Sequence, residues 1–177
     1  MCGIIGITGG GNTLDVLLEG LTRLEYRGYD SAGLSVLPTT AGDPPWRARA
    51  ANGTRSLEDL RKRAEDAPTD ASTGIGHTRW ATHGRPSEGN AHPHVDCRRQ
   101  LALVHNGIIE NHLELSDELV RNGHHLESET DTEVLAHLIE SDLAAHPEAG
   151  LVGAVRETLG RVRGYFAIAV IHAGEPD

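Results

Sequence analysis

The sequence predicts a single domain of the α+β class, in which helices and strands are mixed without strict alternation. The chain has 177 residues, which is the length of one domain. Short β-branched, apolar runs are interspersed with segments whose apolar residues recur at helical spacing. Glycine is abundant, with 21 residues, and this indicates many turns and close backbone approaches rather than a simple helical bundle.

The individual elements follow from hydrophobic period and from turn residues. Strands are expected at residues 2–8, 32–37, 47–51, 74–77, 101–104 and 165–171. Helices are expected at residues 14–24, 56–64, 115–120, 134–139 and 151–162. A capping box, Thr130-x-x-Glu133, precedes the fourth of these helices. Residues 78–94 are rich in Gly, Pro and His and have no period, and a long irregular stretch of this kind is typical of a functional segment.

Charge and hydropathy exclude several classes of protein. Acidic residues outnumber basic ones by 26 to 16, giving a net charge of −10, whereas nucleic-acid binding needs a basic face. The first ten residues, MCGIIGITGG, lack the positive residue that begins a signal peptide. No apolar stretch approaches the roughly 18 residues that a membrane helix needs, and two cysteines do not make a disulfide framework. We therefore expect a cytoplasmic protein that binds neither nucleic acid nor membranes.

Cys2 is a candidate nucleophile because of its position. Methionine aminopeptidases remove Met1 when the next residue is small, and Cys2 would then carry both a thiol and a free α-amine. Such an amine can accept the thiol proton at neutral pH, which activates an otherwise weak nucleophile. The same residue also fits a small apolar side chain at the start of a buried strand, and position by itself favours that interpretation.

Four further segments favour the catalytic interpretation. EYRGYDSAG (residues 25–33), GHTRWATHG (76–84), HNGIIEN (105–111) and SETDTEV (128–134) each place polar, charged and Gly residues at the edge of an apolar element. Side chains of this kind are costly in a core and natural in a ligand pocket. An arginine can bind a carboxylate, an aspartate can bind an ammonium group, and an Asn-Gly pair can direct donors at an oxyanion. The inventory fits an amino-acid substrate that carries a reactive carbonyl.

With these four segments in this order, the sequence resembles the glutaminase domain of the glutamine–fructose-6-phosphate aminotransferase (glucosamine-6-phosphate synthase) family, a group of class II glutamine amidotransferases. The resemblance spans essentially the whole chain. It implies an N-terminal-nucleophile hydrolase fold, with two antiparallel sheets between helical layers in an αββα sandwich. It also implies L-glutamine as the substrate, and no cofactor or metal.

The resemblance implies the catalytic residues as well. Cys2 would attack the side-chain amide of glutamine, and the Asn106 side chain and the Gly107 backbone N–H would form the oxyanion hole. Ammonia would leave, and hydrolysis of a γ-glutamyl thioester would yield glutamate. Arg79 would bind the substrate α-carboxylate and Asp131 its α-amine. The remaining implied site residues are the pocket-lining Trp80, Thr82 and His83 and the supporting Arg27.

Several of these residues also fit ordinary structural roles. Arg27 with Asp30 fits an ion pair near a helix end. Asp131 fits a first-turn carboxylate that the helix dipole favours, and Trp80 fits a core residue. Only the resemblance assigns them to a site.

The residues also suggest two other kinds of site, a dinucleotide-binding site and a metal site. Residues 2–24 form a strand, a Gly-rich turn and a helix, but Leu14 stands where a dinucleotide-binding fingerprint needs its third glycine. A metal site would use His83, His92, His94 and Cys97, with His105 as a further ligand. That set lacks a second close pair with the usual ligand spacing.

The resemblance also bears on the extent of the domain. In the resembled family the glutaminase domain continues with further strands beyond the point that matches Asp177, and a sugar-phosphate isomerase domain accepts the ammonia. Residues 1–177 are therefore expected to be a glutaminase domain shortened at its C-terminal end, without the isomerase domain. Two alternatives for function stay open: an inactive or regulatory fragment that keeps the fold, and a glutaminase that supplies ammonia to a separate synthase partner.

Overall fold

The computed structural model describes residues 2–40, 42–81 and 84–175. The strands are β1 (Gly3–Ile7), β2 (Ser31–Leu37), β3 (Trp46–Ala50), β4 (Thr73–Arg79), β5 (His94–Val95), β6 (Leu101–Ile109) and β7 (Gly164–His172). The α-helices are α1 (Thr13–Leu24), α2 (Ser56–Arg63), α3 (His112–Arg121), α4 (Thr132–Ala145) and α5 (Gly150–Arg161). Short 3₁₀ turns follow α1 (Glu25–Arg27) and α2 (Ala64–Asp66) and precede α5 (Pro147–Ala149).

Two antiparallel sheets form the centre of the molecule. The first has the strand order β1-β4-β2-β3, and the second has the order β5-β6-β7. In the first sheet β1 pairs with β4, so that Gly3 lies opposite Thr78. The N-terminal end of the chain therefore lies beside the end of a strand that is more than seventy residues away in the sequence.

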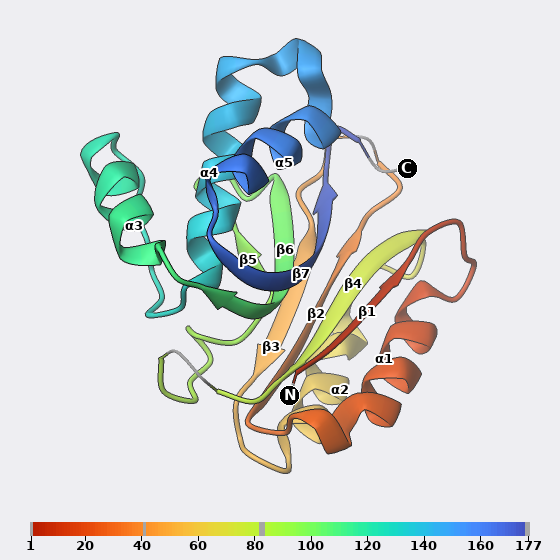
Figure 1. Cartoon of the computed structure of the whole chain (residues 1–177). Helices are drawn as coiled ribbons and strands as arrows, with labels where there is room; N and C mark the ends of the chain where they lie inside the picture. Colours follow the sequence, from red (N-terminus) through yellow and green to blue (C-terminus); the bar gives the residue numbers. More distant parts are fainter. Residues whose placement is uncertain (1, 41, 82–83, 176–177) are drawn as a thin grey trace.

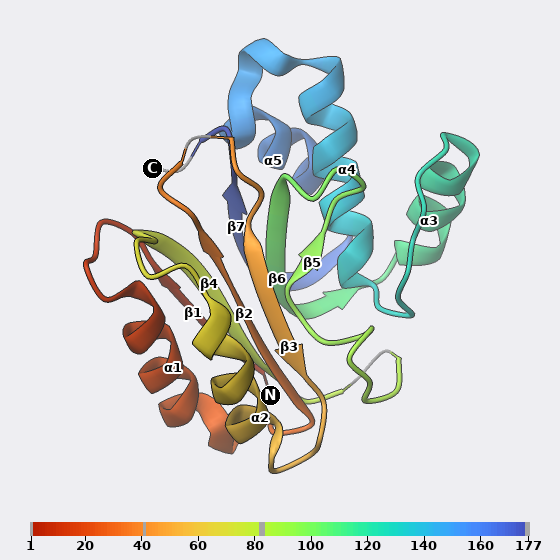
Figure 2. The ribbon, with the colours of Figure 1, turned by 180° about the vertical axis from the view of Figure 1, so that it is seen from behind.

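The helices and sheets form four layers (Figures 1 and 2), and three apolar clusters lie between them. The cluster between the first sheet and helices α1 and α2 includes Leu17, Leu21, Leu34, Val36 and Leu60. The cluster between the two sheets includes Leu37, Ile75, Ala102, Val104 and Ile171. The cluster between the second sheet and the remaining helices includes Leu103, Leu115, Leu119, Leu135 and Ile139. The predicted α+β class and the implied αββα layering are both present.

Helix α4 is the most deeply buried of the helices. Every residue from Thr132 to Ile139 is buried, because the helix packs against β6 on one side and against α3 and α5 on others. A helix that is covered on most sides buries polar residues as well as apolar ones, and here these include Glu133 and His137. Polar groups in such a place need partners, and those partners become important below.

The structure differs from the sequence-based expectation at two places near the site. Strand β6 does not end before His105-Asn106-Gly107 but continues to Ile109, because β7 pairs with it along its whole length. The capping box does not form: Asp131 is the residue before α4, and Glu133 accepts hydrogen bonds from the backbone N–H groups of Glu127 and Ser128. Among the described residues, no helix combines the length and apolarity needed to cross a membrane.

Candidate active site

The thiol of Cys2 lies against the end of β4. The backbone N–H of Trp80 donates to Cys2 Sγ at 3.3 Å, and the thiol points back to Trp80 O at 3.6 Å. The β1–β4 register determines this position, because Gly3 opposite Thr78 places the preceding residue beside Trp80. Cys2 is half-buried, so the sulfur is both held and accessible.

The EYRGYDSAG segment fixes the backbone that holds the thiol. A Cβ on Gly28 would lie 2.6 Å from the carbonyl carbon of Arg79, so only glycine allows the turn to approach this strand end. Asp30 then bonds on both sides of Trp80. Its N–H donates to Arg79 O at 3.1 Å, and its carboxylate Oδ2 accepts from the N–H of Ala81 at 2.9 Å.

The side-chain contacts of Arg27 are with its neighbour in the sequence. Its Nε donates to the hydroxyl of the neighbouring Tyr26 at 3.0 Å, and its guanidinium lies over that ring. Within the described part of the chain, Arg27 forms no ion pair with Asp30, so the ordinary structural interpretation of these two residues is wrong. Asp30 makes the bonds that support the strand end, and a role for Arg27 stays a prediction.

Arg79, the last residue of β4, brings a buried positive charge to the site. Its Nη2 donates to Gly84 O at 3.3 Å. Burial lowers the pKa of the guanidinium, while Cys2, Asp131 and Asp30 act in the opposite direction. Because an arginine starts from so high a pKa, the group remains cationic at neutral pH.

Strand β6 supplies the opposite wall. Asn106 Nδ2 donates to the backbone carbonyl of Cys2 at 3.1 Å, which ties the two sheets together at the thiol. Gly107 has a φ of +150°, and a Cβ there would lie 2.1 Å from the carbonyl oxygen of Tyr165 on β7. The Asn-Gly pair therefore lies on a paired strand rather than in a loose turn, and this makes its donors rigid.

Asp131 joins α4 to β6. The side chain is buried, and its Oδ2 accepts the backbone N–H of Ile109 at 2.9 Å. It forms no side-chain bond to the first turn of its own helix. Its position at the helix start is the one that a dipole-favoured carboxylate takes, but its bond is to the strand beside the site.

One small cavity brings these groups together. Its lining includes five of the predicted site residues, namely Cys2, Arg79, Trp80, Gly107 and Asp131. Asn106 adjoins it through its bond to Cys2. Thr82 and His83 lie outside the described residues, and Arg27 does not line the cavity. Sequence reasoning did not assign four other lining residues to the substrate pocket: His92, His105, Thr130 and Thr132. His105 is the one that a pattern could have found, because it shares a face of β6 with Gly107.

The histidines of the considered metal site are arranged differently from that hypothesis. The rings of His77 and His92 stack with centroids 4.2 Å apart, and His92 and His94 meet edge to face at 4.9 Å. Cys97 lies apart from them and contacts His124 and His137. His83 is outside the described residues. Among those that are described, the proposed set does not converge on one point.

The stacked histidines are expected to make the fold sensitive to acid. Burial lowers the pKa of His77 and of His94 to about 3, and it lowers the pKa of His92 well below the ordinary value. Between about pH 6.5 and pH 3 the unfolded chain therefore binds protons that the folded chain does not. Each such histidine removes up to about 1.4 kcal/mol of stability for every unit that the pH falls in this window.

Urea unfolding at several pH values tests this expectation. The free energy of unfolding should fall steadily as the pH is lowered from about 6.5 to 4.5. The effect of His137 on the free energy of unfolding has the opposite sign. Burial opposes its protonation, but the carboxylates of Glu133 and Glu140 raise its pKa. The stability that protonated His137 contributes is therefore lost as the pH rises. His77→Gln should give a flatter slope than the unmodified chain. If the free energy of unfolding stays constant or increases as the pH falls through this range, the buried histidine rings are not neutral in the folded chain.

Comparison with known protein families shows the family to which the chain belongs. Residues 77–177 match the family described as "Glutamine amidotransferase domain". The chain belongs to this family. The matched range contains Arg79, Asn106, Gly107 and Asp131, while β1 and Cys2 precede it.

Curated relatives extend the similarity of this glutamine amidotransferase domain to its N-terminal part. The glutamine–fructose-6-phosphate aminotransferase (isomerizing) of Symbiobacterium thermophilum is 51% identical over 177 residues, which is 100% of this chain and 27% of that protein. The protein of the same name from Streptomyces coelicolor is 49% identical, over 100% of this chain and 28% of its own length. The chain thus spans about a quarter of the length of these relatives.

Solved structures confirm the fold class. A glutamine phosphoribosylpyrophosphate amidotransferase from B. subtilis has a TM-score of 0.76 and is 25% identical, over 98% of this chain and 35% of its own. A structure described as the allosteric regulatory enzyme of purine biosynthesis has a TM-score of 0.77 and is 26% identical, over 98% and 36%. The N-terminal-nucleophile hydrolase fold that the resemblance implied is therefore confirmed.

Proposed function

We propose that this domain hydrolyses L-glutamine to glutamate and ammonia, with Cys2 as the nucleophile once Met1 has been removed. The observation that supports this most strongly is the convergence on one cavity of the Cys2 thiol, a buried cation at Arg79 and a buried carboxylate at Asp131. A free amino acid carries a carboxylate and an ammonium group, so the two charges match its ends. With both ends of the amino acid bound in this way, the side-chain amide would lie at the Cys2 thiol.

The chemical course follows from these groups. The α-amine of Cys2 takes the thiol proton, and the thiolate attacks the amide carbon. Asn106 Nδ2 and the Gly107 N–H stabilise the oxyanion that forms. The α-ammonium group returns the proton to the leaving nitrogen, ammonia departs, and a γ-glutamyl thioester remains. Water then hydrolyses the thioester to glutamate, and no cofactor takes part.

We propose in addition that the ammonia serves an amination of fructose 6-phosphate. The curated relatives are named for a reaction between glutamine and that sugar phosphate. The acceptor would be a sugar-phosphate isomerase domain, either in the same longer protein or in a separate partner. Ammonia transfer to fructose 6-phosphate by the purified chain with and without such a partner tests this part separately.

Covalent labelling tests the nucleophile directly. The purified chain is treated with a glutamine analogue that carries an electrophilic ketone in place of the amide, and its intact mass and peptide map are recorded. We expect a chain that lacks Met1 and carries one adduct, on Cys2, and we expect Cys97→Ser to label equally. A chain without Met1 that takes no adduct, or takes it only on Cys97, contradicts the proposal.

Arg79→Lys is expected to weaken glutamine binding. A lysine cannot reproduce the paired donors of a guanidinium, so we expect KM for glutamine to rise about 10- to 100-fold with kcat changed only a few-fold. Steady-state glutaminase kinetics measure both constants. Arg85→Lys is the matched control, because Arg85 is exposed and does not line the cavity. A fall in kcat at unchanged KM would remove Arg79 from carboxylate binding.

A further inference from the structure

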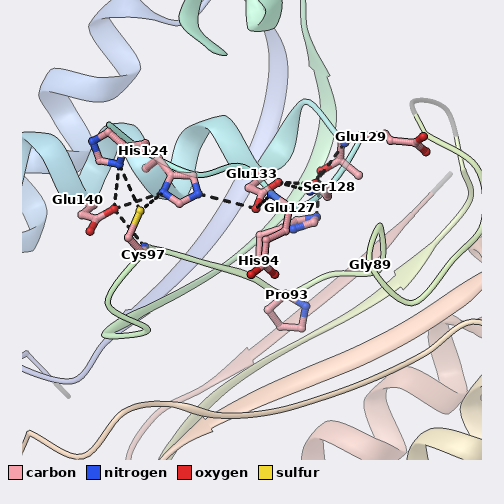
Figure 3. A network of polar contacts seen from close by, with 12 residues as sticks. Gly89, Pro93, His94, Cys97, His124, Glu127, Ser128, Glu129, Glu133 and Glu140 are labelled. Carbon is pink, nitrogen blue, oxygen red and sulfur yellow. Dashed lines mark hydrogen bonds and ion pairs between the residues drawn. The ribbon is translucent and has the colours of Figure 1, made fainter. Parts of the chain in front are cut away.

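A second group of reactive side chains lies outside the active-site cavity. Cys97 comes from the turn between β5 and β6, His124 follows α3, and His137 and Glu140 lie three residues apart on α4. One donor atom from each of these four residues lies within 4.8 Å of the other three. Figure 3 shows Cys97, His124 and Glu140 pointing toward one another, with dashed contacts among them. None of the four lines the cavity that holds Cys2.

The spacing of the donor atoms is that of ligands around one ion. Cys97 Sγ lies 3.6 Å from His124 Nδ1 and 3.4 Å from His137 Nδ1. Glu140 Oε2 lies 3.1 Å and 3.2 Å from the same two nitrogens. A tetrahedral Zn²⁺ with the usual Zn–S and Zn–N bond lengths has ligand-to-ligand edges of about 3.3–3.6 Å. These four distances are close to that edge, and all of the donor atoms lie within 4.8 Å of one another, so movements of the side chains alone would bring them around a common ion.

The outer nitrogen of His124 has a partner of its own, since His124 Nε2 lies 2.7 Å from the hydroxyl oxygen of Ser141. His137 Nε2 forms no hydrogen bond with the residues that the structure describes, and it has the carboxylate of Glu133 3.7 Å away. An oxygen near the outer nitrogen orients the ring of a metal-binding histidine, and a proton on that nitrogen leaves Nδ1 as the ligand atom. In that tautomer both Nδ1 lone pairs face the Glu140 carboxylate, an arrangement that a cation between them stabilises.

We propose that Cys97, His124, His137 and Glu140 form a structural Zn²⁺ site. Thiolate, imidazole and carboxylate are the ligands of Zn²⁺, whereas Mg²⁺ and Ca²⁺ take oxygen ligands. Cys97 loses its thiol proton to solvent on binding, and one thiolate with one carboxylate then balances the charge of the ion. Four protein ligands leave no open position, which is the arrangement of a structural rather than a catalytic site.

The site would add to the hydrogen bonds that already link three segments, in which Glu140 accepts the N–H of Cys97 and Ser141 contacts His124. It would tie the β5–β6 turn and the segment after α3 to the middle of α4. The start of that helix carries Asp131, which bonds to β6 at the active site. A bound ion would thus stabilise the middle of α4, while Asp131 keeps its own bond to β6. This proposal does not depend on glutamine being the substrate.

Metal binding by the whole chain tests the proposal. The purified chain is stripped with a chelator, dialysed, and titrated with Zn²⁺ in competition with a chromophoric chelator. We expect one Zn²⁺ per chain. With Co²⁺ we expect the near-ultraviolet absorption of a thiolate–cobalt bond and the visible bands of a tetrahedral ion. Zn²⁺ should raise the unfolding temperature by more than about 5 °C.

Variants distinguish this site from adventitious binding. Cys97→Ser and Glu140→Gln should each weaken Zn²⁺ binding more than about a hundredfold, and Cys97→Ser should abolish the thiolate–cobalt absorption. His125→Gln is the matched control, because His125 is adjacent and exposed but is not one of the four ligands. A cooperative unfolding transition of Cys97→Ser, at a temperature close to that of the metal-free unmodified chain, shows that this variant is folded.

Three results would overturn the proposal. The first is less than one equivalent bound at a tenfold excess of Zn²⁺. The second is equal affinity in Cys97→Ser and the unmodified chain. The third is an octahedral cobalt spectrum without thiolate absorption. Any of these would mean that a proton on His137, rather than a metal ion, occupies the centre of the cluster.

Discussion

Replacing Cys2 by Ser is expected to lower the rate of glutamine hydrolysis by at least about 10⁴-fold, because the loss of a catalytic nucleophile removes the covalent route entirely. A serine hydroxyl is a far weaker acid than a thiol, so an α-amine cannot activate it to a comparable extent. The backbone of Trp80, which contacts the thiol, is held independently by Asp30. The substitution should therefore leave the unfolding temperature nearly unchanged.

Ammonia release from glutamine, followed with a coupled assay, measures this effect. Cys97→Ser is the control for the other cysteine and should retain at least half of the activity. Retained hydrolysis in Cys2→Ser would mean that another group attacks the amide. A large fall in unfolding temperature would instead mean that Cys2 acts mainly in packing the start of β1, as the structural interpretation of its position holds.

The element pattern could be predicted because it depends on local order. The leucine spacing of α1 and the β-branched run of β1 report their own burial, whatever their partners are. The pairing of β1 with β4 could not be derived in this way, because the two strands are far apart in sequence and neither has a residue pattern that specifies its partner. That pairing places Trp80 against the thiol, so residue patterns could not predict the local geometry of the nucleophile.

The candidate site also contains residues that the sequence could predict and residues that it could not. Motif resemblance selected Cys2, Arg79 and Asp131, and the structure places all three on one cavity. The role of Asp30 in holding the end of β4 was not predicted. In a sequence, a carboxylate that accepts a backbone N–H cannot be told from any other charged residue in a turn. Gly28 follows the 3₁₀ turn after α1, and its missing side chain also admits the backbone of Arg79, a close approach that the sequence does not reveal.

Long sequence separation also explains why the sequence did not reveal the histidines that contact Cys97. Ligand spacing directed attention to the nearest histidines in the sequence, but those rings are buried in a stack of their own. The histidines that contact Cys97 lie 27 and 40 residues further along the chain. Glu133 gave a comparable false signal, because its spacing from Thr130 matched a capping box while its carboxylate binds the segment before the helix.

Asn106→Ala is expected to lower kcat for glutamine hydrolysis by about 10²–10³-fold, or roughly 2.7–4 kcal/mol, with KM changed less than about threefold. The amide of Asn106 lies 3.1 Å from the carbonyl of Cys2 and thus beside the thiol, where charge develops as the amide carbon becomes tetrahedral. A donor that acts on the oxyanion stabilises the transition state more than it stabilises bound glutamine, so its loss should mainly lower kcat.

The same bond also gives Asn106 a second role, because it anchors the residue that carries the nucleophile, and the two roles predict different kinetics. If anchoring dominates, Asn106→Ala should lower the unfolding temperature and raise KM together with the loss of kcat. If oxyanion stabilisation dominates, the unfolding temperature and KM should change little. Asn111→Ala is the matched control, since Asn111 bonds to the backbone of Arg161 and Arg163 away from the cavity. It should affect stability and spare kcat. Equal kcat losses in both variants would mean that Asn106 acts through the fold and that Gly107 is left as the sole oxyanion donor of this pair.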